Sequence, residues 1–289
     1  MSSQTLMTKT LNLKTSEAYI FKTFAELLNN VFTRYDFHIS KKDLTVKQVN
    51  VDESIMITAR LHKFDKFEVS ENRTVGMIAN HLPKLTKSIK KKDLLKIYIS
   101  HLETDKLSLK VYDASKDRNN TSDVRIQDFE SFQNGQEIMP PDFGEHFPTV
   151  VIQSNDFQKM CKVMNGISKS ICIEAQENAV IFMGGTSSIY GRKENFGKWR
   201  DSQPTLFKMN IPTKMLNDIS KCCGLSKKLR IYAKPDLPLR ISVDVGSMGE
   251  ADIFISDPSR DLDNPPSSSP PSRSTSGSTS KNLSGHPSK

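Results

Sequence analysis

A helix followed by a β-hairpin occurs twice in the chain, and this repeat constrains the possible folds more than any other feature. In the second copy, apolar side chains recur at i, i+3, i+4 and i+7 from Phe157 to Met164, which gathers them on one helix face. Ser154 is expected to cap this helix and Gly166 to end it. Residues 171–183 then alternate in polarity around a short turn. The pattern predicts a helix packed across an antiparallel sheet.

The first copy of the module begins at Ser16, with an apolar helix face from Ile20 to Val31 and a hairpin over residues 37–49. Each copy is followed by a second helix of the same character, one opening at Asn80 and the other near Pro212. All four predicted helices carry lysine on the side opposite the apolar face. The repeat therefore predicts an α+β protein of two similar domains, each with two helices packed on antiparallel sheets.

Breaks in periodicity divide the chain into segments. Glycine and proline interrupt any regular element between the two copies, which predicts a connecting loop. From Ser259 to Lys289 more than half of the residues are Ser or Pro and none is aromatic, so this tail is expected to be disordered. We predict an N-terminal domain over 1–129, a connecting loop over 130–148, a C-terminal domain over 149–258 and a Ser/Pro-rich tail over 259–289.

The net charge favours a polyanionic partner. The 289 residues carry a formal charge of +8, and the tail from Ser259 onward holds four basic and two acidic residues, so +6 belongs to the predicted domains. A positive total alone does not say where the charge lies. The lysines on the backs of four helices are therefore the informative part.

Several classes of protein are not indicated by the sequence. The four cysteines lie in or beside apolar stretches without metal-ligand spacing, which predicts buried thiols in a reducing compartment. No apolar run approaches the roughly 18 residues of a membrane span, and the N-terminus lacks the apolar core of a signal peptide. The six histidines form no HExxH motif, and Gly184 and Gly185 do not continue as a phosphate-binding loop. We expect a soluble, intracellular protein that is not an enzyme and uses no cofactor or metal.

The arrangement from about Leu11 to Asp257 resembles the sliding clamps of the proliferating cell nuclear antigen (PCNA) type. The segments that carry the resemblance are the hairpin 37–50, the strands and basic helix of 64–87, the basic helix 154–164 and the C-terminal strands 237–258. The predicted connecting loop also falls where the family carries its own. The resemblance implies a DNA-clamp fold, in which three subunits assemble head to tail into a ring with helices around the hole and sheets outside.

In this family the ring encircles duplex DNA, and lysines of the inner helices face its phosphates. The matching positions are Lys22, Lys84, Lys87, Lys159, Lys162 and Lys221. Ammonium groups on flexible stems contact phosphates without reading base edges. Binding to double-stranded DNA is therefore expected to be independent of sequence and dependent on salt.

The resemblance also implies protein partners. In the family an apolar pocket under the connecting loop accepts short peptide motifs from DNA polymerases and other replication and repair proteins. The matching positions are Val49, Ile55, Ile57, Ile138, Met139, Pro140, Pro238, Phe254 and Ser256. Subunit contacts pair edge strands, which here match about 107–112 and 186–192, including Leu107, Leu109, Val111, Ser188 and Tyr190. A clamp loader is a further implied partner, and the implied location is the nucleus, or a viral replication site for a virus-encoded protein.

Three interpretations remain open at this point. The lysines on the helices of both domains favour a homotrimeric processivity clamp. A subunit of a heterotrimeric checkpoint-type clamp, or a monomeric clamp-fold factor for transcription or repair, would have edge strands that do not pair with copies of themselves. An enzyme or RNA-binding protein of unrelated fold would show activity or aromatic stacking sites. Residues 138–140 have a simpler alternative as well, namely a loop that packs on its own domain.

Overall fold

The computed structural model describes residues 9–113, 115–127, 139–144, 147–185 and 191–257. All of them fall within one compact unit. Below, 9–127 is called the N-terminal half and 147–257 the C-terminal half. The tail 259–289, which was predicted to be disordered, lies outside the described residues. Most of the predicted connecting loop lies outside them as well. Among the residues that are described, no helix is long and apolar enough to cross a membrane.

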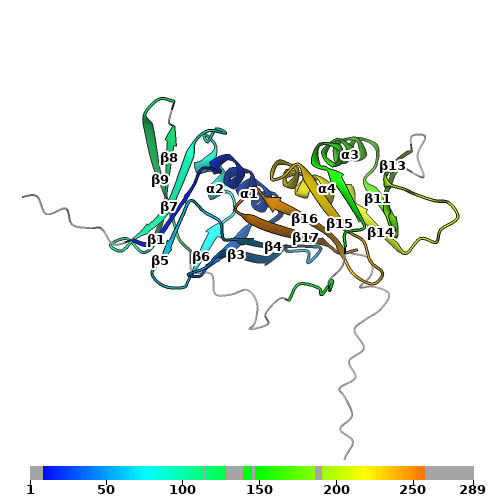
Figure 1. Cartoon of the computed structure of the whole chain (residues 1–289), viewed down its shortest axis with the longest axis horizontal. Helices are drawn as coiled ribbons and strands as arrows, with labels where there is room; N and C mark the ends of the chain where they lie inside the picture. Colours follow the sequence, from blue (N-terminus) through cyan, green and yellow to red (C-terminus); the bar gives the residue numbers. More distant parts are fainter. Residues whose placement is uncertain (1–8, 114, 128–138, 145–146, 186–190, 258–289) are drawn as a thin grey trace, which may run out of the picture. The chain divides into compact units, whose positions relative to one another are not determined.

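The N-terminal half contains two helices and a run of strands (Figure 1). Its elements are β1 (Lys9–Thr15), α1 (Ala18–Val31), β2 (Arg34–Ile39), β3 (Leu44–Val49), β4 (Ile55–Leu61), β5 (Lys66–Val69), β6 (Arg73–Ile78), α2 (His81–Thr86), β7 (Leu94–Ser100), β8 (Lys106–Asp113) and β9 (Arg118–Arg125).

The C-terminal half follows the same order. Its elements are β10 (Val150–Gln153), α3 (Ser154–Ile167), β11 (Ser170–Gln176), β12 (Ala179–Gly184), β13 (Arg192–Gly197), β14 (Phe207–Pro212), α4 (Thr213–Ile219), the 3-10 helix η1 (Ser220–Gly224), β15 (Lys228–Tyr232), β16 (Leu239–Val245) and β17 (Gly249–Ile255). Each half is thus a strand, a helix, further strands, a second helix and three final strands, and β5 is the one strand of the N-terminal half without a counterpart among the described elements. The internal repeat of helices and hairpins agrees with the mixed helix-and-sheet fold predicted from the sequence.

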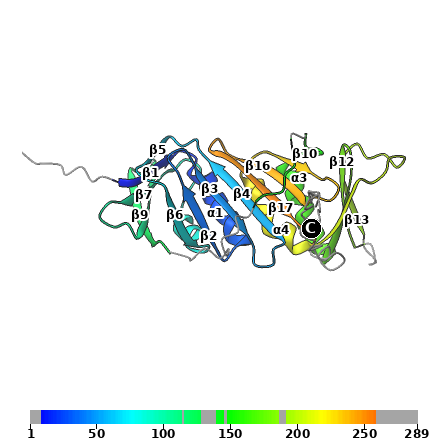
Figure 2. The same ribbon diagram turned by 90° about the horizontal axis from the view of Figure 1, so that it is seen from below.

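The strands form three antiparallel sheets. Sheet A has the order β5-β1-β7-β8-β9, sheet B the order β10-β15-β16-β17-β4-β3-β2-β6, and sheet C the order β13-β12-β11-β14. Sheet B contains strands of both halves, joined where β17 pairs with β4 from Gly249 opposite Leu61 to Ile255 opposite Ile55 (Figure 2). The two halves therefore share one continuous sheet.

The helices cover one face of sheet B, as both ribbon views show (Figures 1 and 2). The apolar face predicted for α3 is buried, with Phe157 and Met164 fully enclosed. In α1 the buried face includes Phe21, Phe24 and Leu28. Because α1 also packs against α4 and η1, the helices of the two halves meet over the shared sheet. One continuous apolar core results.

Three predicted helix ends differ from those in the structure. Ser154 is the first residue of α3 rather than its cap, and its hydroxyl donates to the carbonyl of Ser226, 2.6 Å away. The helix also continues past Gly166 to Ile167. Gly166 has open space around it and takes part in the helix as an ordinary residue, so it does not end the helix. The first helix begins at Ala18, after Glu17, and so two residues beyond the predicted cap Ser16.

Candidate nucleic-acid interface

The six lysines expected to face phosphates all lie on or beside helices. Lys22 is in α1, Lys84 and Lys87 are in and just after α2, Lys159 and Lys162 are in α3, and Lys221 is in η1. Lys22 is half-buried and the other five are exposed. The structure thus places them on the elements that cover one face of sheet B. Their contacts within the chain differ.

Lys22 is held by the end of a neighbouring helix. Its Nζ donates to the carbonyl of Lys87 at 2.8 Å and to that of Ile89 at 3.4 Å. The last carbonyls of a helix have no partner within the helix and carry partial negative charge, so a cation placed there is stabilising. Lys22 therefore fixes α2 against α1, which reduces its freedom to reach a phosphate.

Two of the other lysines have carboxylate partners. Lys221 Nζ lies 2.6 Å from Oε2 of Glu26, and Lys159 Nζ lies 3.9 Å from Oδ1 of Asp156. By contrast, Lys84, Lys87 and Lys162 form no ion pair with any described residue. These three have ammonium groups that are exposed and available to a phosphate.

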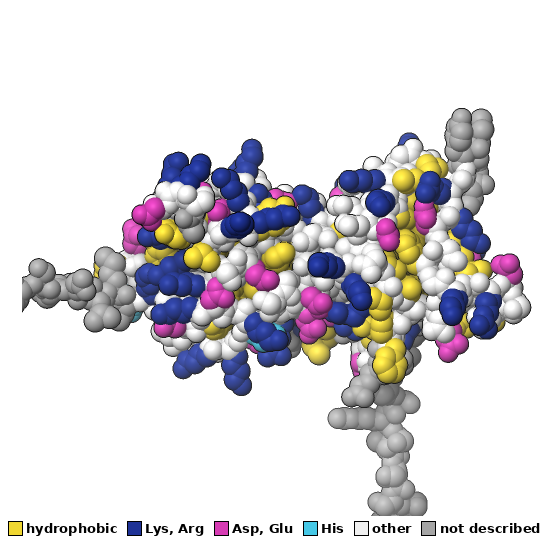
Figure 3. Space-filling view, turned by 45° about the horizontal axis from the view of Figure 1, so that its top comes forward, with side chains coloured by type: hydrophobic (Ala, Val, Ile, Leu, Met, Phe, Trp, Pro, Cys, Tyr) yellow, Lys and Arg dark blue, Asp and Glu magenta, His cyan; other side chains and the backbone are white. Residues whose placement is uncertain are grey.

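Acidic groups are interspersed among the basic ones on the helix side. The space-filling view turned toward this side shows Lys and Arg side chains over both halves, with Asp and Glu between them (Figure 3). Asp218 in α4 is one such carboxyl, and partial burial raises its pKa although Lys214 acts in the opposite direction. A surface of this kind suits many weak contacts with a polyanion better than a few strong ones.

The predicted peptide pocket corresponds to a groove of about 610 Å³ on the other face of sheet B. Five of the nine predicted residues line it, namely Val49, Met139, Pro238, Phe254 and Ser256. Ile55 and Ile57 do not, because they point into the core with exposures of 2% and 0%, and Met56 between them lines the groove instead. Side chains of a strand alternate between its faces, so the prediction chose the wrong face of β4. Ile138 lies outside the described residues.

An aromatic cluster beside this groove holds part of the connecting segment. Phe143 is 4% exposed and packs with Met56, Tyr232 and Phe254. The Arg240 guanidinium lies over the rings of Tyr232 at 4.7 Å and Phe143 at 5.5 Å, and both Asp252 oxygens accept its hydrogen bonds. Lys234 Nζ also donates to the carbonyl of Phe143 at 3.1 Å. Phe143 therefore anchors the segment to the sheet.

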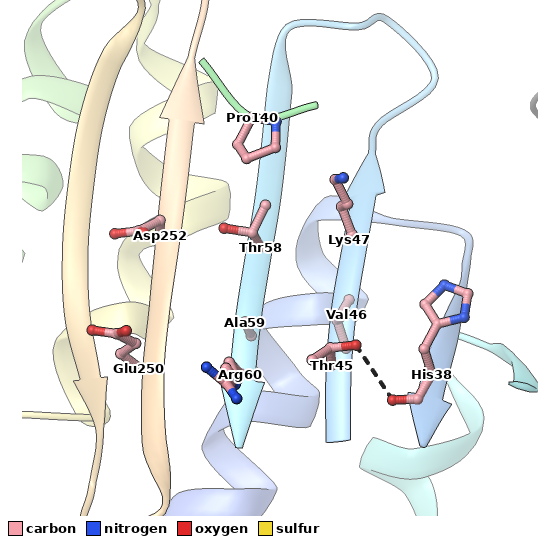
Figure 4. Close-up of a pocket in the computed structure, with 10 residues that line it drawn as sticks. All are labelled: His38, Thr45, Val46, Lys47, Thr58, Ala59, Arg60, Pro140, Glu250 and Asp252. Carbon is pink, nitrogen blue, oxygen red and sulfur yellow. Dashed lines mark hydrogen bonds between the residues drawn. The ribbon is translucent and has the colours of Figure 1, made fainter. Parts of the chain in front are cut away.

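A second groove, of about 660 Å³, adjoins the first under the same segment. It is lined by His38, Thr45, Val46, Lys47, Thr58, Ala59, Arg60, Pro140, Glu250 and Asp252 (Figure 4). Pro140, predicted to line the peptide pocket, lies here instead, across β4 above Thr58. Arg60 pairs with Asp43 at 2.7 Å, and a hydrogen bond from Ser40 together with this arginine lowers the pKa of Asp43. Charged groups of both signs make this groove more polar than the first.

The predicted edge strand of the N-terminal half is not an edge. Leu107, Leu109 and Val111 lie in β8 and are buried, and β8 pairs with β7 on one side and with β9 on the other. The edges of sheet A are β5 and β9, and β9 is a polar strand whose apolar alternation is too weak for a sequence pattern to reveal. In sheet C the edges are β14 and β13, and β13 begins at Arg192. Ser188 and Tyr190 lie outside the described residues.

The described residues contain no group of three His, Cys, Asp or Glu side chains that could hold a metal ion. Cys161 and Cys222 are fully buried, and burial raises the pKa of the Cys161 thiol. Such thiols are poor nucleophiles.

The sheets, the helix layer and the groove define a class of protein, the chains with the DNA-clamp fold. A family model described as the N-terminal domain of proliferating cell nuclear antigen matches residues 10–134. The proliferating cell nuclear antigen of Caenorhabditis elegans is 20% identical over 253 residues, which cover 84% of this chain and 94% of that protein. The crystal structure of the protein of that name from Entamoeba histolytica aligns with a TM-score of 0.71 at 16% identity, over 86% of this chain and 99% of that one. The chain thus has the clamp fold, and its residues 10–134 match the N-terminal domain of the PCNA family.

Proposed function

We propose that three copies of this chain form a ring that encircles duplex DNA and tethers replication and repair enzymes to it. The observation that carries the proposal is the helix layer shared by both halves, with exposed lysines on α2 and α3. Lysines contact phosphates without reading bases, so such a ring can slide. Retention then comes from topology, and affinity for DNA remains weak. The chain acts as a scaffold without catalysis of its own.

The internal repeat supports closure of the ring by free sheet edges. Within the chain, the last strand of the C-terminal half, β17, pairs with the fourth strand of the N-terminal half, β4. The counterparts of these two strands by element order are β9 and β13, and both are sheet edges. Pairing β9 of one copy with β13 of the next would join sheet A to sheet C and reproduce the arrangement of sheet B. Contacts of this head-to-tail kind generate rings when the rotation closes.

The groove around Val49, Met56 and Phe254 is the proposed docking site for peptide motifs of a DNA polymerase and other partners. It combines an apolar floor with an exposed rim at Met139, which is 70% exposed. Short apolar anchors of a peptide can fill such a groove while main-chain groups bond to a nearby strand. A clamp loader that opens the ring is a further proposed partner. We place the protein in the nucleus, or at a viral replication site if a virus encodes it.

Native mass by light scattering, measured over a concentration series at moderate salt, tests the ring directly. One chain has a mass of 32.6 kDa, so a homotrimer has three times this value. A stable trimer supports the proposal. A monomer at all concentrations would contradict it and would favour a ring completed by different subunits, or a clamp-fold factor that does not encircle DNA.

A further inference from the structure

Four lysines lie directly opposite one another across four neighbouring strands of sheet A. Lys14 of β1 is paired with Lys66 of β5 on one side and with Lys96 of β7 on the other, and Lys96 is paired in turn with Lys110 of β8. Cross-strand partners point to the same face of a sheet. The four side chains, here called the lysine row, therefore form a line across sheet A.

The lysine row faces solvent. The alternate residues of the same strands, such as Leu13, Ile97 and Leu109, point the other way into the core and are at most 4% exposed. Lys14 is exposed, and Lys66, Lys96 and Lys110 are partly exposed. The row thus occupies the sheet face opposite to the one that packs on the core, and it is separate from the helix lysines considered above.

The positive charge of the row is poorly neutralised. Lys66 pairs with Glu68 at 2.8 Å, but Lys14, Lys96 and Lys110 form no ion pair with any described residue. A fifth lysine adds to the charge, because Lys9 Nζ lies 4.2 Å from the ring centre of Tyr98, which Lys96 also approaches at 5.6 Å. Lys9 and partial burial lower the pKa of Lys96 to about 8, which reflects the crowding of ammonium groups.

Like charges directly opposite each other destabilise a sheet. Strand positions that face solvent accept many polar residues, so nothing in the packing requires lysine on four strands in line. The arrangement places mutually repelling charges on sheet A, and among the described residues Lys66 is the one member of the row that gains an ion pair, with Glu68. A bound polyanion would reverse this effect by placing negative charge between the ammonium groups.

We propose that the lysine row binds the phosphates of a single-stranded nucleic acid on the face of sheet A away from the helices. Neighbouring strands are about 4.8 Å apart, so the row spans about 14 Å, enough for several consecutive phosphates. A single strand can bend to follow a row on a twisted sheet, whereas a duplex is stiff over this distance. The site does not depend on the proposed ring, because it lies on one chain and on the opposite side of its core.

The test uses a closed circle of single-stranded DNA of mixed sequence, which a closed protein ring cannot thread. Affinity is measured over a salt series for the wild-type chain and for the triple variant Lys14→Gln, Lys96→Gln and Lys110→Gln. The matched control replaces the exposed Lys41, Lys42 and Lys63 by Gln and removes the same charge.

We expect the triple variant to bind the circle about tenfold more weakly, and the slope of log K against log salt to shrink by about 2, as for the loss of three phosphate contacts. The control variant should keep most of the affinity. Circular dichroism and native mass should show an unchanged fold. If the triple variant does not fold, the test is repeated with the single variants Lys14→Gln and Lys110→Gln. Failure of the wild type to bind the circle would overturn the proposal, as would a loss in the triple variant no larger than that in the control variant. Equal weakening on a closed duplex circle, or displacement of the circle by polyglutamate at equal charge, would overturn it as well.

Discussion

Glu26 in α1 and Lys221 in η1 are 195 positions apart in the chain, and their carboxylate and ammonium lie 2.6 Å apart. The pair joins the helix of one half to the helix of the other. Its side chains are 27% and 46% exposed, so its contribution to stability is at most about 1 kcal/mol. Its larger effect is on the charge of the helix side, because it neutralises one of the lysines expected to face DNA.

Glu26→Gln should therefore strengthen binding to duplex DNA. The substitution removes a negative charge from the helix side and frees Lys221, and one additional phosphate contact raises affinity and increases the salt slope by about 1. Glu174→Gln is the matched control, since Glu174 pairs with Lys208 at 2.9 Å between two strands of sheet C, away from the helices. Fluorescence anisotropy with labelled duplex over a salt series measures both. Equal effects of the two substitutions would show that only net charge matters.

Lys22 and Lys162 should differ when each is replaced by Gln. Lys22→Gln removes the ammonium that bonds to the carbonyls of Lys87 and Ile89, so the free energy of unfolding should fall by about 1–2 kcal/mol with little change in DNA affinity. Lys162 has no such contact, so Lys162→Gln should weaken DNA binding and leave stability within about 0.5 kcal/mol. Urea unfolding and DNA titration of the same samples distinguish the two. A reversed pattern would contradict the roles assigned to them.

Phe143 and Phe147 are two phenylalanines of the same connecting region with opposite environments. Phe143 is 4% exposed within the aromatic cluster, and Phe147 is 95% exposed. Phe143→Ala should lower the free energy of unfolding by about 3 kcal/mol, the usual order for a buried phenylalanine, and Phe147→Ala should leave it unchanged within about 0.5 kcal/mol. Urea unfolding measures both. Similar small effects would show that the segment is not anchored through Phe143.

Buried thiols should make stability depend on pH in the alkaline range. A hydrogen bond with Cys223 and burial raise the pKa of the Cys222 thiol, while in the unfolded chain this thiol ionises near pH 8.5. The pKa of Cys222 is higher in the folded than in the unfolded protein. The contribution of this thiol to the free energy of unfolding is therefore fully present below pH 8.5 and is lost as pH rises above it. At pH 9.5 the loss is about 1.4 kcal/mol for one thiol.

Comparison with Cys222→Ala removes the contributions of groups that do not contact Cys222. The stability advantage of the wild type over the variant, measured by urea unfolding under reducing conditions, should shrink by about 1.4 kcal/mol between pH 7.5 and pH 9.5. A constant difference would show that Cys222 does not resist ionisation in the folded protein.

Much of the fold follows from hydrophobic periodicity. The apolar stripe of α3 and the alternation of Leu95, Ile97 and Ile99 in β7 are strong local signals, and the residues they select are buried. The antiparallel strands and the helices packed on them were therefore predictable. The exact ends of helices were less so, because Ser154 bonds to a carbonyl of another segment, and sequence spacing does not reveal such a partner.

The site was predictable only in part, since its details depend on strand faces and on contacts between distant segments. The choice between Ile55 and Met56 rests on which side of β4 faces the core, and both are apolar. The polar strand β9 carries almost no apolar signal, so this edge of sheet A was missed. The lysine row joins Lys14 to residues on three other strands, and only the register of the sheet brings them together.

The central claim is that the protein holds DNA by encircling it, and a trapping experiment tests this most directly. A linear duplex with biotin at both ends is incubated with the protein, streptavidin is added to block the ends, and the complex is washed with concentrated salt, which removes contacts to phosphates. The account predicts that protein remains bound, that cutting the duplex releases it, and that adding streptavidin before the protein prevents trapping. Complete loss in the salt wash would contradict encirclement and would leave only electrostatic binding.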